Sequence, residues 1–341
     1  MGGTSMTNLA GATLLITGAS GFTGRHACTH FSQKGMHVVA LTRDKAAWEA
    51  QGIEGTALYC DLSNEQGIRD AVARVQPDYV LHLAGQNAVR SSWQEPLHTV
   101  QVNMLGTLYL LDALRTCRSS RIIVVTSKLK SSLFELFTPM HPYGFSKGLQ
   151  ELAAYAWGSL FDLDVVLAEP SNLIGPGPST GICSLLAQHA VEQERGCNKG
   201  AFTLHHGHST RDYVDVRDAV SAYEQLFVAG ERGVSYEIAS GVQRTLVEVV
   251  KVLNACAAVD IEVKWQQDPA VGDGDAQIAL DKASERISST EASKMLEEEQ
   301  AAQQSSSKPP VRSAAMLGWR RSFSFEQSIQ DIMAYHQERV R

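Results

Sequence analysis

Short apolar runs rich in β-branched residues recur along the first half of the chain, and segments with a helical pattern separate them. Six of these runs are predicted to be strands, at 12–17, 37–41, 56–60, 78–84, 121–127 and 163–169. Strands that alternate with helices form parallel sheets joined by helical crossovers. The runs are continuously apolar, which is typical of strands covered by helices on both faces. The pattern therefore predicts an α/β fold with a doubly wound parallel sheet.

After about residue 170 this rhythm loosens. A Gly/Pro-rich break at 175–181 precedes further apolar runs at 201–205, 234–239 and 261–265. We expect this part to form a smaller, C-terminal substrate-binding lobe. The predicted division is therefore a first domain at 1–170 and a second part at 171–341 that interleaves with it.

One segment of the second part differs in composition. Residues 282–312 are polar and rich in Gln, Ser and Glu, and this is typical of a surface excursion. We therefore expect a polar insertion here. A helical pattern follows, with Ile329, Ile332 and Met333 on one side, and it predicts a terminal helix that docks on the protein.

Composition narrows the classes of function. A formal net charge of -7, with 20% charged residues, leaves no broad basic face, so we expect no nucleic-acid or membrane partner. The six cysteines show no CxxC pair, and we predict reduced thiols and no metal site. No apolar stretch is long enough to span a bilayer, and we expect a cytoplasmic protein.

The stretch TGASGFTGRHA, at 17–27, spaces Gly18, Gly21 and Gly24 three residues apart. It lies between a predicted strand and a predicted helix, which is the context of a turn that binds a dinucleotide pyrophosphate. Glycines let the phosphates approach backbone N–H groups at the helix N-terminus. The sequence therefore predicts a Rossmann-type nucleotide site in the first domain. Its turn residues are Gly18, Ser20, Gly21, Phe22, Thr23 and Gly24.

The end of the second strand bears on the choice of cofactor. An acidic residue there binds the ribose 2′-hydroxyl of NAD, whereas an arginine accommodates the 2′-phosphate of NADP. The chain reads Thr42, Arg43, Asp44 at this point. Arg43 favours NADP(H). The alternative is that Arg43 is a solvated surface residue and Asp44 contacts the ribose of NAD(H).

Tyr143 and Lys147 stand four residues apart in a predicted helix, so both side chains lie on one face. A lysine ammonium beside a phenol favours the phenolate and would lower the tyrosine pKa. The pair is thus a candidate for proton transfer. Upstream, Thr126 and Ser127 end a predicted strand, where a hydroxyl could bond to a substrate oxygen.

These features, in this order with Asp61–Leu62, HLAGQ at 82–86 and VNMLGT at 102–107, resemble the extended short-chain dehydrogenase/reductase family. The resemblance implies that Tyr143 is the general acid/base, that Lys147 orients the nicotinamide ribose, and that Ser127 holds the reacting oxygen, with Thr126 as the alternate. It also implies cofactor contacts by Asp61, Leu62, Leu83, Ala84 and Gly85.

Longer stretches are similar to the nucleotide-sugar branch of that family, which includes GDP-4-keto-6-deoxymannose reductases and hexose 4,6-dehydratases. They include EPSNLIGPG at 169–177 and STRDYVDVRDAVSAY at 209–223. The resemblance implies that Gln86 and Arg90 line the sugar pocket, that Asn172 contacts the sugar or diphosphate, and that Arg211 binds a substrate phosphate. The alternative for Arg211 is an ion pair with Asp212 or Asp215.

Two departures from the family pattern affect the reaction. The 4,6-dehydratases carry an acidic residue after the strand-end hydroxyl, whereas this chain has Lys128 and Leu129, and Glu169 stands where relatives often carry arginine. The histidines at 205, 206 and 208 are read as loop residues. The resemblance therefore implies NADPH-dependent reduction of a nucleotide-diphospho-4-keto-6-deoxyhexose. An NAD-dependent 4-epimerase, a dehydratase and a silent nucleotide-binding relative remain as alternatives.

Relatives often pair through two long helices. Here those helices would be 96–116 and 142–161, where Leu149, Leu152, Ala153 and Tyr155 would face a partner or pack on the sheet. We expect a homodimer with a four-helix interface.

Overall fold

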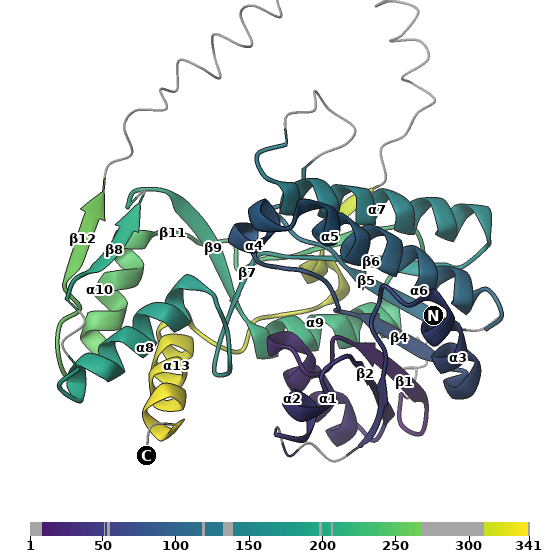
Figure 1. Ribbon diagram of the computed structural model, residues 1–341, viewed down its shortest axis with the longest axis horizontal. Helices are drawn as coiled ribbons and strands as arrows, with labels where there is room; N and C mark the ends of the chain where they lie inside the picture. Colours follow the sequence, from purple (N-terminus) through teal and green to yellow (C-terminus); the bar gives the residue numbers. More distant parts are fainter. Residues whose placement is uncertain are drawn as a thin grey trace, which may run out of the picture.

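Eight parallel strands form the central sheet of this computed structural model (Figure 1), which describes residues 9–50, 52, 55–117, 120–131, 139–197, 200–205, 207–266 and 310–339. The strand order is β13-β10-β6-β5-β4-β1-β2-β3, and every neighbouring pair is parallel. The strands are β1 (Thr13–Thr17), β2 (His37–Thr42), β3 (Thr56–Tyr59), β4 (Tyr79–His82), β5 (Arg121–Val125), β6 (Asp164–Pro170), β10 (Ser235–Ile238) and β13 (Val311–Ser313). All six runs predicted as strands belong to this sheet, which confirms the Rossmann-type fold.

Helices cover both faces of the sheet. Figure 1 shows α6 (Gly106–Leu114) and α7 (Pro142–Leu160) above it, and α1 (Phe22–Gln33) and α9 (Val216–Ala229) below it. The helix α3 (Glu65–Val75) packs beside α6. Since successive strand side chains point to opposite faces, a strand buried on both faces must be apolar throughout.

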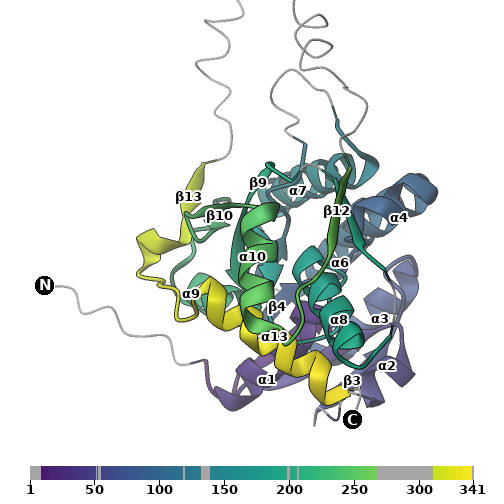
Figure 2. The same cartoon turned by 90° about the vertical axis from the view of Figure 1, so that its left-hand side faces the viewer.

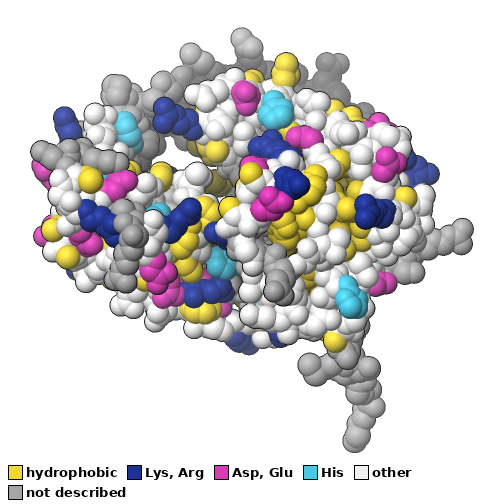
Figure 3. Space-filling view, turned by 60° about the horizontal axis from the view of Figure 1, so that its bottom comes forward, with side chains coloured by type: hydrophobic (Ala, Val, Ile, Leu, Met, Phe, Trp, Pro, Cys, Tyr) yellow, Lys and Arg dark blue, Asp and Glu magenta, His cyan; other side chains and the backbone are white. Residues whose placement is uncertain are grey.

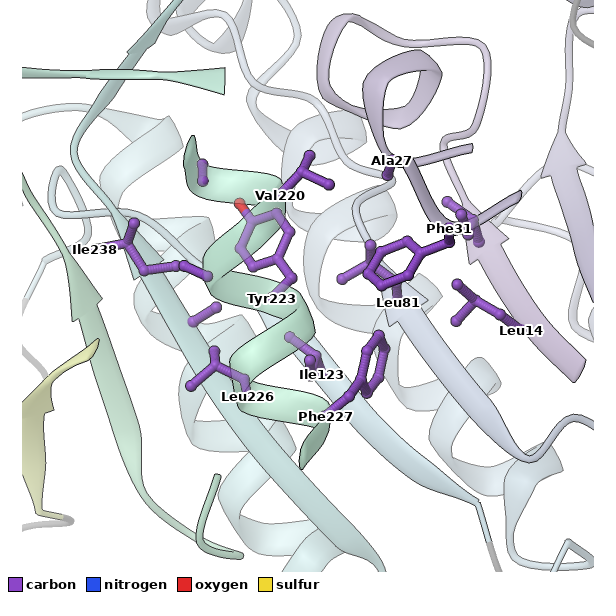
Figure 4. Close-up of a cluster of buried hydrophobic side chains, with 14 of the residues drawn as sticks. Leu14, Ala27, Phe31, Leu81, Ile123, Val220, Tyr223, Leu226, Phe227 and Ile238 are labelled. Carbon is purple, nitrogen blue, oxygen red and sulfur yellow. The ribbon is translucent and has the colours of Figure 1, made fainter. Parts of the chain in front are cut away.

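The strand β1 illustrates this double burial. Leu14 and Ile16 lie in one core cluster, and Leu15 lies in another with residues of α3, α6 and α7. Figure 4 shows the first cluster, where Phe31 of α1 and Phe227 of α9 approach each other with ring centroids 5.7 Å apart. These contacts fix α1 and its glycine turn against the sheet.

The smaller lobe has its own sheets and core. The strands β7 (Asn172–Ile174), β9 (Thr210–Asp215) and β11 (Gln243–Thr245) form one sheet, and β8 (Phe202–His205) pairs with β12 (Val263–Gln266). Figure 2 shows α8 (Ile182–Glu194), α10 (Leu246–Cys256) and α13 (Phe325–Arg339) gathered on this side. The predicted terminal helix is confirmed, because α13 buries Ile329, Ile332 and Met333. In Figure 3 an opening separates this lobe, at the left, from the rest of the molecule.

The C-terminal half also contributes to the main sheet, through β10 and β13. Val311 and Arg312, which the sequence placed in the polar insertion, belong to β13 instead. The sequence missed this strand because it is a short edge strand whose Val311 is exposed. The rest of the predicted insertion, residues 282–309, lies outside the described residues.

Several short helices complete the described structure. They are α2 (Lys45–Glu49), α4 (Val89–Gln94), α5 (Pro96–Val100), the π-helix η1 (Gln101–Leu105) and the 3-10 helix η2 (Ala314–Leu317). Within the described ranges, no helix is both long enough and apolar enough to cross a membrane.

Candidate active site

The glycine turn between β1 and α1 has a geometry that only glycine fits. Gly18 has φ +69°, and a Cβ there would lie 2.8 Å from the backbone of Ala84. A Cβ on Gly24 would lie 2.2 Å from the Gly18 carbonyl oxygen. The helix α1 therefore begins in direct contact with the turn, and the turn sits against the loop that follows β4.

The N-terminus of α1 is available to an anion. Its N-cap is Gly21, which has no side chain to accept a hydrogen bond from the first N–H groups, and the first turn holds no acidic residue. Unpaired N–H groups and the helix dipole both favour a phosphate at such an end. The turn and the helix end together fit the pyrophosphate of a dinucleotide.

A cavity of about 200 Å³ opens beside this turn, at the carboxyl ends of the strands. In an open α/β sheet this edge is where ligands bind. Most of the cofactor residues predicted from the sequence line the cavity, namely Gly18, Ser20, Gly21, Arg43, Asp61, Leu62, Leu83, Ala84 and Gly85. Phe22, Thr23 and Gly24, which form the first turn of α1, do not line it, and neither do Tyr143 and Lys147, the other two predicted cofactor residues. Gln86, predicted to face the sugar, lines it too.

Arg43 and Asp44, the two residues that bear on the choice of cofactor, have different surroundings at the rim of the cavity. The Arg43 side chain is 71% exposed, and its guanidinium lies 4.0 Å from the Asp61 carboxylate. Asp44 instead caps α2, where its carboxylate accepts a hydrogen bond of 2.8 Å from the Ala47 N–H. Asp44 is thus turned toward the helix, whereas Arg43 extends along the cavity wall.

Tyr143 and Ser127 meet at the end of β5. The Tyr143 side chain is buried, with 6% of its surface exposed, and Pro142 and the N-cap His141 start α7 directly before it. Burial raises the pKa of Tyr143, and a hydrogen bond with the Ser127 side chain lowers it in part. The alternate hydroxyl, Thr126, is turned away and donates to the carbonyl oxygen of Ala168 at 3.2 Å.

The direction of the Tyr143 pKa differs from the prediction. The sequence predicted that Lys147 would lower it, but the structure gives a raised pKa because the phenol is desolvated. A phenol with a raised pKa keeps its proton at neutral pH. The raised pKa makes the phenol a weaker acid than a solvated one, so its suitability as a donor rests on its position.

Lys147 is buried one turn further along α7, with 2% of its surface exposed. Its Nζ donates to the Val125 carbonyl oxygen at 3.2 Å and to the Gln150 side-chain oxygen at 2.9 Å. Burial lowers the pKa of Lys147 to about 8. A Cβ on Gly85 would lie 3.5 Å from this Nζ, so the ammonium stands beside the cavity wall.

Asn103 is a site residue that the sequence analysis missed. It lies in the π-helix η1, and π-helical turns often occur at functional sites. Its Oδ1 accepts from the Gln86 N–H at 2.7 Å, and its Nδ2 donates to Ser146 Oγ at 2.8 Å. Asn103 thereby ties the loop at 83–87, which lines the cavity, to α7. The only sequence signal was its place in the VNMLGT stretch.

Basic side chains occupy the strand end where dehydratases carry acids. Lys128 pairs with Glu237, and the half-buried Lys130 pairs with both Glu169 and Glu151, the latter at 2.8 Å. The unusual Glu169 is therefore half of an ion pair. Among the described residues between Ser127 and Tyr143 there is no carboxylate, while Glu135 lies outside them.

The predicted substrate residues are divided between two elements. Asn172 of β7 donates to the Asp212 carbonyl oxygen at 2.9 Å, and Arg211 lies next to Asp212 on the paired strand β9. Arg90, on α4, is exposed and does not line the cavity.

The alternative for Arg211 is a structural ion pair with Asp212 or Asp215. Within the described ranges, neither carboxylate pairs with it. The Asp212 carboxylate binds Ser171 and Ser240, and Asp215 binds Arg217 and Ser328. Arg211 instead faces the Tyr213 hydroxyl and, across the strand ladder, is directly paired with Arg244. The Arg244 guanidinium is already paired with Glu326 at 3.1 Å, so Arg211 is the arginine of this pair that no described carboxylate neutralises.

The histidine cluster shows no metal geometry in the described part. Nowhere among those residues do three His, Cys, Asp or Glu side chains gather as a metal site. His206 lies outside the described residues.

Comparison with known proteins agrees with this geometry. The chain is 27% identical over 340 residues to the GDP-6-deoxy-D-mannose reductase of Pseudomonas aeruginosa, covering 96% of this chain and 98% of that protein. It is 26% identical to a dTDP-glucose 4,6-dehydratase of Xanthomonas campestris, covering 95% of this chain and 93% of that protein. A UDP-glucose 4-epimerase of Yersinia pestis is also 26% identical, over 71% of this chain and 82% of the epimerase.

Solved structures give the same result for the fold. RMD from Pseudomonas aeruginosa, complexed with NADPH, superposes with a TM-score of 0.72 at 25% identity, covering 96% of this chain and 99% of that one. The UDP-glucose 4-epimerase of Thermus thermophilus, in complex with NAD, superposes with a TM-score of 0.73 at 21% identity, covering 95% and 99%. The model of the NAD dependent epimerase/dehydratase family matches residues 14–239, more than half of the chain, and the protein therefore belongs to this family of extended short-chain dehydrogenase/reductase enzymes.

Proposed function

We propose that the protein reduces a nucleotide-diphospho-4-keto-6-deoxyhexose to the 4-hydroxy sugar with NADPH. The observation that carries this proposal is the state of Tyr143. Its phenol is buried and hydrogen-bonds with the Ser127 side chain just beyond the end of β5. Ketone reduction needs a proton donor beside the carbonyl oxygen, and a phenol that retains its proton supplies one.

The residues around the cavity support NADPH as the cofactor. Gly18, Gly21 and the N-terminus of α1 would hold the pyrophosphate. Arg43 would bind the 2′-phosphate, because its guanidinium is exposed at the rim and its planar fork suits phosphate. Asp44 is occupied as a helix cap, so the competing contact with the ribose of NAD loses its acceptor. The relative whose structure was solved with NADPH points the same way.

When bound, NADPH supplies the hydride that reduces the sugar carbonyl. Tyr143 would donate the proton to the carbonyl oxygen, and Ser127 would hold that oxygen by a hydrogen bond. Lys147 would bind the nicotinamide ribose. Its positive charge would stabilise the negative charge that Tyr143 develops as it loses its proton. Burial of Tyr143 and Lys147 keeps bulk water away from both groups.

The smaller lobe would hold the nucleotide diphosphate. Arg211 is the candidate phosphate ligand, since no described carboxylate pairs with it. Asn172 and Gln86 lie near the carboxyl ends of the strands and would contact the sugar. Arg90 is exposed on α4 and would reach the sugar only if substrate draws it in.

The same groups would also serve a 4-epimerase, which recycles a tightly held NAD and consumes none. The lysines at the strand end argue against the dehydratase, because Lys128 and Lys130 stand where water elimination would need an acid and a base. A silent nucleotide-binding relative would keep the glycine turn without turnover.

We also propose a homodimer through α5, α6 and α7. An apolar groove is lined by residues of α4, α5 and the start of α7, among them Trp93, Leu97, Pro142 and Phe145, and Leu97 is 84% exposed. On α7, Leu152 is exposed, Leu149 and Tyr155 are half-buried, and Ala153 is buried. Leu97→Asp should convert a dimer to a monomer in light scattering, and an unchanged mass would refute this interface.

One experiment separates the reductase from its rivals. The purified protein is denatured and the supernatant assayed for released NAD(H), and the native protein is then titrated with NADPH and NADH. A reductase should be purified without bound cofactor and should bind NADPH more tightly than NADH. Stoichiometric copurified NAD would favour the epimerase, and binding without turnover on any 4-keto sugar would favour the silent relative.

A further inference from the structure

A buried chain of polar side chains connects Lys147 to the glycine turn. Gln150, fully buried on α7, accepts from Lys147 through Oε1 and donates through Nε2 to Thr107 Oγ1 at 2.9 Å. Thr107 in turn contacts His82 Nε2 at 2.8 Å, and His82 Nδ1 contacts Thr17 Oγ1 at 2.8 Å. Thr17 is the last residue of β1, directly before Gly18. The chain thus runs from the catalytic helix to the cofactor turn.

The direction of each hydrogen bond in this series of side chains follows from the number of protons that each group can donate. The Thr107 hydroxyl donates its proton to the Asn103 carbonyl oxygen at 2.7 Å, so it can only accept from Gln150 and His82. His82 must therefore carry its proton on Nε2. Thr17 then donates to Nδ1, and its oxygen accepts from the Ala84 N–H at 3.1 Å. Since Thr107 can only accept, the amide nitrogen of Gln150 must point toward it. The amide oxygen of Gln150 therefore points toward Lys147.

We propose that Gln150 is a positioning residue that holds the Lys147 ammonium in its place at the cofactor cavity. This inference rests on the proposed function, because the ammonium is the group that would meet the cofactor ribose. The Val125 carbonyl and Gln150 are the two hydrogen-bond acceptors that the described structure gives Lys147. Of these, only Gln150 is a side chain and is itself held by a second bond.

Few charged groups surround Lys147. Tyr143, on the same helix, has a raised pKa and is neutral, and His82, from β4, is neutral because burial and the Lys147 charge lower its pKa to about 3. Glu151, also on α7, pairs with Lys130. The main electrostatic effect on Lys147 is desolvation. A neutral amide oxygen in a desolvated site therefore supplies a large part of the stabilisation of the ammonium.

The test titrates Lys147 directly in the cofactor-free protein, so it does not depend on the proposed reaction. The ¹³Cε resonance of Lys147, assigned by its loss in Lys147→Arg, is followed against pH in wild type, Gln150→Leu and Gln150→Glu. The midpoint should fall by about half a unit or more in Gln150→Leu and rise by about one unit or more in Gln150→Glu. Gln188→Leu and Gln188→Glu, on the exposed face of α8, are the matched controls and should leave it unchanged.

A second arm measures the dissociation constant of NADPH at each pH by calorimetry. Affinity should weaken about tenfold in Gln150→Leu near neutral pH, because the ammonium, still mostly protonated there, loses the side chain that positions it, and should recover in Gln150→Glu. Gln150→Glu keeps the size of the side chain, so the Lys147 midpoint and the NADPH affinity can be measured in this variant even if Gln150→Leu unfolds. Equal midpoints in wild type and Gln150→Glu would overturn the proposal, as would moved midpoints with unchanged NADPH affinity. A wild type that binds no NADPH, yet shows the moved midpoints, would refute the proposed function alone.

Discussion

Ser127 contacts the Tyr143 phenol, whereas its neighbour Thr126 donates to the backbone of β6. Two adjacent hydroxyls at one strand end thus have different roles, because successive side chains of a strand point to opposite faces. The contact joins the end of β5 to the start of α7. It places a second hydroxyl where a reacting oxygen would meet the tyrosine.

Replacing the two hydroxyls should separate their roles. Ser127→Ala should lower kcat about 100-fold, because the reacting oxygen loses a hydrogen-bond donor that is most effective in the transition state. Thr126→Val keeps the shape and should lower the free energy of unfolding by about 1 kcal/mol with little change in kcat. Steady-state kinetics and chemical denaturation measure both. Equal kcat losses in the two variants would contradict the assignment of Ser127.

Arg43 should control the choice between the two nicotinamide cofactors. Arg43→Ala should weaken NADPH binding about 10- to 100-fold and leave NADH binding unchanged, because only NADPH carries the 2′-phosphate. Asp44→Ala is the matched control. It removes the cap of α2 and should lower stability by about 1 kcal/mol without changing the preference. Titration calorimetry with each cofactor decides, and an equal loss for NADPH and NADH would exclude a 2′-phosphate contact.

The glycine turn should tolerate no side chain at Gly24. Gly24→Ala should lower the free energy of unfolding by about 3 kcal/mol and abolish cofactor binding, because its Cβ would overlap the Gly18 carbonyl oxygen. Gly233→Ala is the control for backbone conformation, since Gly233 has φ +73° with open space around it. That variant should cost about 1–2 kcal/mol and bind cofactor normally. Comparable losses of binding in both would show that the close packing at Gly24 is not the cause.

His82 should make the protein less stable in acid. Its folded pKa is about 3, below the usual 6.5, so between these values the unfolded chain binds a proton that the folded protein does not. The contribution of His82 is therefore fully present above pH 6.5 and is lost as pH falls toward 3, at up to about 1.4 kcal/mol per pH unit. Urea denaturation of wild type and His82→Gln at several pH values measures it. Parallel pH dependences would contradict a neutral buried His82.

The sheet could be predicted from the sequence because its strands are buried on both faces and therefore leave continuous apolar runs such as 12–17 and 121–127. The edge strand β13 could not, because Val311 is exposed and the other two residues of the strand, Arg312 and Ser313, are polar. Tyr143 and Lys147 could be paired by their spacing. The direction of the Tyr143 pKa could not, since it depends on burial by segments distant in sequence.

The partners of Lys147 lay beyond the sequence for a similar reason. Gln150, Thr107 and His82 come from different elements, and each would be unremarkable alone in its own helix or strand. The Lys147–Gln150 contact follows from their i,i+3 spacing on α7, but only the fold brings Thr107 and His82 within hydrogen-bond distance of this pair and of each other. Likewise, Glu169, which departs from the family pattern, is paired with Lys130, a contact that the sequence did not indicate.

The most direct test of the proposed reaction follows NADPH oxidation with a panel of nucleotide-diphospho-4-keto-6-deoxyhexoses, in wild type and Tyr143→Phe. The proposal predicts that one sugar class drives oxidation of one NADPH per sugar and yields the 4-hydroxy product, and that Tyr143→Phe lowers the rate about 1000-fold or more while still binding NADPH. No oxidation with any of these sugars, or an equal rate in Tyr143→Phe, would contradict it.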